Sequence, residues 1–162
     1  MQGHPALGIA KRLLEKAHER GLSLTPMQLI KLVYLAHGWM LGLHSRPMIQ
    51  EPVEAWQYGP VVRTVYDRVK QYRSRPVEAI AGRPRTPDLD EEEEDLLDQV
   101  LTVYGDQPGT FLSMITHQEG TPWDLTWRHF GRNGSISNDL IEAHFAELYR
   151  RAHEDTAERP SN

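Results

Sequence analysis

A helix that is apolar around its whole circumference constrains how this chain can fold more than any other feature. It is predicted to begin at Pro26, with Thr25 as its N-cap and Gln28 placed to complete a capping box. Apolar residues then occupy every side of the helix, and Lys31 is the only formal charge before Arg46. Such a helix is normally buried, and its apolar run falls short of the about 20 residues that a membrane span needs. We therefore expect the central core helix of a soluble domain.

The next segment is expected to be extended and to lead into a second helix. Prolines at positions 47 and 52 disfavour a helix there. Gly59 permits a backbone angle that other residues avoid, and Pro60 is then expected to start a helix that ends at Tyr72. The three-four spacing of its apolar residues predicts one buried stripe, made of Val62, Val65, Tyr66, Val69 and Tyr72.

The rest of the chain predicts further helices and no second domain. Helices are expected at 5–20, 88–104, 108–118, from Pro122 to about Phe130, and after the cap Ser137, whereas 73–87 and 132–135 read as loops. The expected fold is mainly α: one compact domain over 1–151 with six or seven helices around the central one. At most a short two-stranded element is expected between Met48 and Gln57, and 152–162 are expected to be a polar, frayed tail. The buried residues predicted in the later helices include Phe111, Leu112, Met114, Ile115, Leu140, Ile141, Phe145, Leu148 and Tyr149.

Charge is distributed unevenly along the 162 residues, whose net charge is -5. Residues 1–87 hold 13 Lys and Arg against 6 Asp and Glu, whereas residues 88–162 hold 5 against 17. The two halves can complement each other within one fold. Alternatively, the acidic face steers a basic partner, such as an RNA-binding toxin.

Composition also limits the chemistry. The chain has no cysteine, which excludes disulfides, thiolate metal sites and a cysteine nucleophile. Among eight histidines, His37 and His44 would lie ~10 Å apart along a helix, too far to share an ion. The first residues lack the basic start and apolar run of a signal peptide. We therefore expect a cytoplasmic protein with no metal and no cofactor.

Evidence for catalysis in the sequence is weak. Ser113 and His117, with Asp124 nearby, could supply a nucleophile and a base. However, the chain has no nucleophile elbow, phosphate-binding glycine loop, dinucleotide fingerprint or zinc-protease motif. A structural arrangement is simpler, in which His117 bonds a backbone carbonyl and Trp123 packs over it. We expect no enzyme, and we keep a hydrolase as a third hypothesis.

The ordered motifs of the chain resemble the Panacea domain family of SocA-like antitoxins. They are KLVYLAHGW at 31–39, RPM at 46–48, EAWQYGPVV at 54–62, LSMITH at 112–117 and TPW at 121–123, followed by Ile136 and Phe145. The resemblance spans roughly residues 8 to 149. It implies an antitoxin of a bacterial or prophage toxin-antitoxin system that neutralises a protein toxin by direct binding. Family members act on unrelated toxins, so the resemblance specifies no particular one.

We expect the toxin-facing surface to lie where aromatic residues flank irregular backbone, because Trp, Tyr and Arg are favoured at binding hot spots. Core packing is the alternative explanation for these aromatic residues. The predicted surface comprises Trp56, Gln57, Tyr58, Gly59, Pro60 and Arg63, with His117 and Trp123 beside it.

The second hypothesis for function is a DNA-binding autoregulator of its own operon. Arginines in the 73–87 loop could contact phosphate. That segment has neither aromatic platforms nor a recognition helix, and the second half of the chain is acidic. We therefore expect no nucleic-acid partner.

Overall fold

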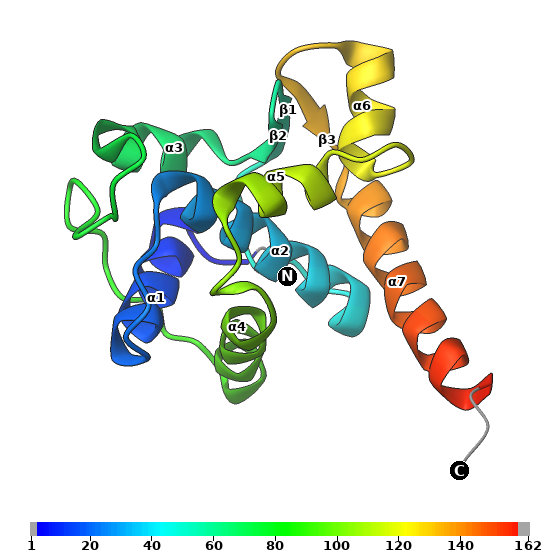
Figure 1. Ribbon diagram of the computed structural model, residues 1–162, viewed down its shortest axis with the longest axis horizontal. Helices are drawn as coiled ribbons and strands as arrows, with labels where there is room; N and C mark the ends of the chain where they lie inside the picture. Colours follow the sequence, from blue (N-terminus) through cyan, green and yellow to red (C-terminus); the bar gives the residue numbers. More distant parts are fainter. Residues whose placement is uncertain (1–2, 159–162) are drawn as a thin grey trace.

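The computed structural model describes residues 3–158 and is mainly α-helical, as the sequence predicts (Figure 1). Within that range the chain forms seven α-helices, one short 3-10 helix and three short strands. In chain order they are α1 (Ala6–Glu19), α2 (Pro26–His44), β1 (Val53–Trp56), β2 (Gly59–Val61), α3 (Arg63–Val69), η1 (Lys70–Tyr72), α4 (Glu91–Tyr104), α5 (Gly109–Thr116), α6 (Pro122–Phe130), β3 (Gly134–Ile136) and α7 (Asn138–Glu158).

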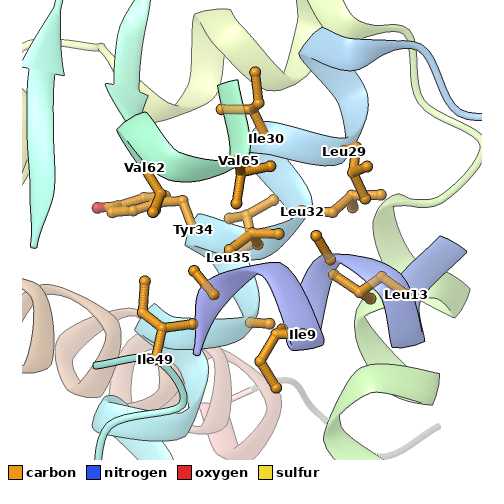
Figure 2. Close-up of a cluster of buried hydrophobic side chains, with 14 of the residues drawn as sticks. Ile9, Leu13, Leu29, Ile30, Leu32, Tyr34, Leu35, Ile49, Val62 and Val65 are labelled. Carbon is orange, nitrogen blue, oxygen red and sulfur yellow. The ribbon is translucent and has the colours of Figure 1, made fainter. Parts of the chain in front are cut away.

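Helix α2 is the central element, and its predicted start is confirmed. The Thr25 side chain accepts a hydrogen bond from the Gln28 N–H, and the Gln28 side chain accepts one from the Thr25 N–H at 2.8 Å. Helices α1, α4, α5 and α7 surround α2 (Figure 1). Figure 2 shows Ile9 and Leu13 of α1 in one buried cluster with α2 side chains such as Leu32. Within the described residues no helix is both long and apolar enough to cross a membrane.

Helix α7 packs closely against α2 where two glycines face it. A Cβ atom added at Gly38 would lie 2.2 Å from the ring of Phe145, and one added at Gly42 would lie 2.6 Å from the Phe145 Cβ. The Phe145 ring also makes edge contacts with Tyr34 and Trp39, at centroid distances of 5.8 and 5.0 Å. The two glycines therefore leave room for an aromatic side chain between the two helices.

His37 of α2 fixes two other segments. Its Nδ1 accepts hydrogen bonds from the backbone N–H groups of Met48 and Ile49 at 3.2 and 3.3 Å. Its Nε2 therefore carries the proton and donates to the Asn138 side chain at 2.9 Å. Burial lowers the pKa of this imidazole, which keeps it neutral.

The prediction of a helix beginning at Pro60 is wrong. Pro60 lies in β2 and pairs with Ala55 in a three-stranded antiparallel sheet of order β2-β1-β3. A proline is accepted there because β2 is an edge strand, where its missing N–H interrupts no ladder. The helix begins three residues later, at Arg63, and its last turn is the 3-10 helix. The sheet also has one strand more than predicted, since 134–136, which include the last two residues of the expected loop 132–135, pair with β1 as β3.

The oppositely charged halves complement each other within the fold. The basic face of α1 lies against the acidic face of α4: Arg12 and Lys16 both contact the Glu94 carboxylate, and Lys16 also reaches Asp98 at 2.9 Å. Arg46, just after α2, contacts three acidic residues at the start of α4: Asp90, Glu92 and Glu93. Much of the acidic run is thus neutralised internally, which leaves little of it to steer a basic partner.

Several apolar side chains predicted to be buried are exposed. Leu112, Ile141 and Phe145 lie in the core as expected. The exposed ones are Phe111, Met114, Leu140, Leu148 and Tyr149, all on α5 and α7, which cover α2 from outside. Helix α7 also continues to Glu158, past the expected start of the tail at Ala152, while 159–162 lie outside the described residues.

Candidate functional site

The tip of the β1–β2 hairpin is the most prominent part of the predicted surface. Trp56 pairs with Gly59, so Gln57 and Tyr58 form a two-residue turn between the strands. Both side chains of the turn are exposed, and Tyr58 keeps 62% of its surface accessible. Large apolar groups at this exposure are available to a partner.

Three side chains from three helices hold the backbone of this tip. Each donates a hydrogen bond to a main-chain carbonyl oxygen, and the three acceptors belong to every second residue of the hairpin. The bonds run from Trp123 Nε1 to Trp56 (2.6 Å), from Ser113 Oγ to Tyr58 (2.5 Å) and from Lys31 Nζ to Pro60 (2.9 Å). These donors come from α6, α5 and α2. Because the bonds are made to main-chain oxygens, they fix the position of the tip and leave the side chains of its turn free.

His117 and Trp123 support the tip from behind. The His117 Nδ1 hydrogen-bonds to the Ser113 carbonyl oxygen, and its ring meets Trp123 edge-on at 5.2 Å. Trp123 is 8% exposed and stacks on Trp127 at 5.1 Å. The expected structural arrangement of His117 and Trp123 is thus observed. Since the Ser113 hydroxyl donates to Tyr58 and His117 bonds a carbonyl, the two side chains do not form a nucleophile and base pair.

Arg63 and Trp56 form a second, polar edge of the surface. The Glu54 carboxylate accepts from the Trp56 indole N–H at 3.2 Å and from the Arg63 guanidinium at 2.9 Å. The guanidinium lies 5.1 Å from the centre of the Trp56 ring, within the range of a cation–π contact. The same ring also makes an edge contact with Tyr66, at a centroid distance of 4.8 Å. The half-buried Trp56 is therefore held in one orientation.

Gly59 is required at its position by both conformation and space. Its φ of 119° is in the range that favours glycine, and a Cβ there would lie 3.2 Å from both the Cε and the Nζ of Lys31. The Lys31 side chain is only 3% exposed, and burial lowers its pKa to about 7. The Tyr-Gly-Pro turn is thus shaped around a buried amine.

A cavity of about 520 Å³ opens beside the hairpin. It lies between the start of α2, the hairpin tip, α3 and η1, and the turn before β3. Three residues of the predicted surface line it: Trp56, Gln57 and Tyr58. This volume is of the size found for small-ligand sites and for pockets that receive a partner's side chains.

The structure brings the eight predicted residues together in two layers. Gln57, Tyr58 and Arg63 are exposed and Trp56 is half-buried, whereas Gly59, Pro60 and Trp123 are buried and His117 lies partly buried behind them. Sequence reasoning missed the role of Lys31 and the contribution of Ser113 to the tip. Lys31 had a detectable signal, because it is the only charge in an otherwise apolar helix.

Comparison with known sequences shows the class of protein to which the chain belongs. The sequence model described as "Antitoxin SocA-like, Panacea domain" matches residues 29–124, a range that contains all eight predicted site residues. The chain therefore belongs to the SocA-like Panacea domain family of antitoxins. One curated relative is "Antitoxin SocA" of Caulobacter vibrioides (strain NA1000 / CB15N), which is 29% identical over 162 residues, covering 92% of this chain and 84% of the relative. No solved structure matches this chain.

Proposed function

We propose that this protein is the antitoxin of a bacterial or prophage toxin-antitoxin system, and that it neutralises its toxin in the cytoplasm by direct binding, without catalysis. The observation that carries the proposal is the Tyr58 side chain, 62% exposed on a hairpin tip whose backbone three helices hold in place. Membership of an antitoxin family supports a toxin as the partner.

The rigidity of the tip favours a role in binding. Association costs free energy when loops and side chains must be ordered. The cost is of the order of 1 kcal/mol for each immobilised side chain. Here the turn is ordered before the partner arrives, since its flanking carbonyls are already bonded to Trp123, Ser113 and Lys31. A partner would bury Tyr58 and the accessible part of Trp56 at a reduced entropic cost.

The positions of Ser113 and His117 support binding rather than catalysis. Both of their polar contacts are to backbone carbonyl oxygens of this domain. A nucleophile needs a base within hydrogen-bond reach and a third group that orients the base. Ser113→Ala is therefore expected to loosen the hairpin tip rather than to remove a reactive hydroxyl.

Co-expression with the toxin encoded by the neighbouring gene tests the proposal. Wild-type protein should restore growth and co-purify with the toxin. Tyr58→Ala should weaken the complex by at least ten-fold, the size of effect of an aromatic hot spot, with an unchanged melting temperature. Tyr149→Ala is the matched control, because it removes a similarly exposed tyrosine from α7.

Two results would contradict the proposal. Full growth rescue by folded Tyr58→Ala would show that this tip is not the toxin-binding surface. Salt-dependent binding of the chain to its own promoter, without a complex with the toxin, would favour the DNA-binding autoregulator instead.

A further inference from the structure

The cavity beside the hairpin combines apolar walls with an unbalanced positive charge. Ile30, Trp56, Val61 and Tyr66 supply apolar and aromatic surface. Four lining residues carry a lysine or arginine side chain, and none of the lining residues carries a carboxylate. The cavity is thus suited to a ligand with an apolar group and a negative charge.

The cations of this cavity differ from those that join α1 and the end of α2 to α4. On α1 and after α2, Arg12, Lys16 and Arg46 each contact a carboxylate of α4. At the cavity, Arg73 and Arg132 make no ion pair in the part of the chain that the structure describes. The remaining rim cation, Lys70, lies over the Tyr66 ring and reaches Asp67 only at 3.6 Å.

Lys31 is the cation best placed to recognise a ligand. Its amine is buried in the cavity wall, and among the described residues it has one acceptor, the Pro60 carbonyl oxygen at 2.9 Å. An ammonium group can donate three hydrogen bonds. A buried cation with unused donors costs stability, and an incoming anion would offset that cost.

The backbone at the rim is also held in sparsely populated conformations. Arg73 has a φ of 58° and Asn133 a φ of 64°, and both residues line this cavity. Positive φ in residues other than glycine is uncommon and concentrates at binding sites. The rim therefore resembles a shaped site more than an incidental gap between helices.

We infer that this cavity binds a carboxylate-bearing segment of the partner toxin, with an apolar side chain against Trp56 and Tyr66 and the carboxylate facing the Lys31 amine. The inference rests on the proposed function, because it takes the partner to be a protein. Carboxylates are the anions that an unmodified protein partner supplies, and Arg73 and Arg132 at the rim attract the same charge.

Small probes test the site without the toxin. The full chain, labelled with 15N, would be titrated near pH 6.5 with 3-phenylpropionate, 3-phenylpropionamide and phenyl phosphate. The readout is the indole N–H signal of Trp56, identified by its loss in Trp56→Phe. We expect the carboxylate to bind about ten-fold more tightly than the amide of the same shape, the usual effect of one charge-assisted hydrogen bond.

Substitutions of Lys31 and Arg132 test which cation causes the preference for the carboxylate over the amide. Lys31→Met should bind the carboxylate and the amide equally, and it should fail to restore growth against the toxin while remaining folded. Arg132→Gln changes an exposed side chain, so folding is not at risk, and it should weaken carboxylate binding by roughly two- to three-fold.

The results that would contradict the carboxylate site differ from those that would contradict the proposed function. Equal binding of carboxylate and amide by the wild type, no saturable binding of either, or tightest binding of phenyl phosphate would each overturn the carboxylate site. Full growth rescue by Lys31→Met would overturn its assignment to the toxin. If instead folded Tyr58→Ala neutralises the toxin while the carboxylate preference holds, the toxin-binding tip fails and the anion site stands.

Discussion

Lys31 is a charged side chain inside the central, largely apolar helix of the chain. Folding moves its amine from water to a buried site, where it donates a hydrogen bond to the Pro60 carbonyl oxygen. This burial lowers the amine pKa from 10.5 to about 7. The unfolded chain therefore binds more protons than the folded chain between those pH values, so folding stability should rise with pH in that window.

The pH dependence of stability can be measured against Lys31→Met, which lacks the titrating group. We expect the free energy of unfolding of the wild type, relative to this variant, to increase by about 3–5 kcal/mol between pH 6 and pH 10.5. Urea unfolding at several pH values gives this difference, and groups common to both proteins cancel. A difference independent of pH would mean that the buried amine keeps its ordinary pKa.

Some residue roles could be predicted from the sequence and others could not. The Thr25 cap could be predicted, since a cap depends on neighbours a few positions away. The bond from the Ser113 hydroxyl to Tyr58 could not, because it joins residues 55 positions apart through tertiary packing. The two layers of the site were also hidden, since sequence spacing does not distinguish exposed Tyr58 from buried Trp123.

At the scale of elements, the contact between α2 and α7 depends on small residues. Gly38 and Gly42 lie one turn apart on α2 and face Phe145. Glycine usually weakens a helix by about 1 kcal/mol relative to alanine, so close packing must offset that cost here.

Gly38→Ala should therefore destabilise the protein although alanine favours helix formation. The added Cβ would lie 2.2 Å from the Phe145 ring, and we expect a loss of about 1–3 kcal/mol in the free energy of unfolding. Chemical denaturation measures the loss. Phe145→Leu combined with Gly38→Ala should cost less than the sum of the two single changes, and simple additivity would argue against the clash.

Elements differed in how well the sequence predicted them. Apolar stripes mark the helices within their own sequence, and side-chain caps also mark the starts of α2, α4 and α6, so most helix positions were predicted closely. Strand β3 has only three residues and exists through its pairing with β1, a partner about 80 residues earlier. The false helix start at Pro60 has the same origin, since pairing with Ala55 outweighs a local helix signal.

At the scale of the whole molecule, charge pairing joins distant parts of the chain. Burial raises the pKa of the Glu94 carboxylate, but hydrogen bonds from Lys16 and Arg12 outweigh this effect and leave its pKa below the ordinary value. A carboxylate with a lowered folded pKa stabilises the fold above its unfolded pKa, and this contribution is lost as the pH falls.

Glu94→Gln is expected to lower the free energy of unfolding by about 1 kcal/mol at pH 7, and the difference should be smaller at pH 3. Thermal or urea unfolding at both pH values checks this. Glu91→Gln is the control, because it changes an exposed carboxylate on the same helix. Equal effects of the two substitutions would assign the loss to the helix dipole rather than to the contacts with α1.

The hairpin is held by hydrogen bonds to its carbonyl oxygens, and this determines which of its residues can be substituted. The groups held by Trp123, Ser113 and Lys31 are present in every amino acid, so the bonds do not depend on which side chains stand at positions 57 and 58. Gly59 is constrained, but the two residues before it can be exchanged without altering the scaffold. One framework can thereby present different exposed side chains through very few codon changes.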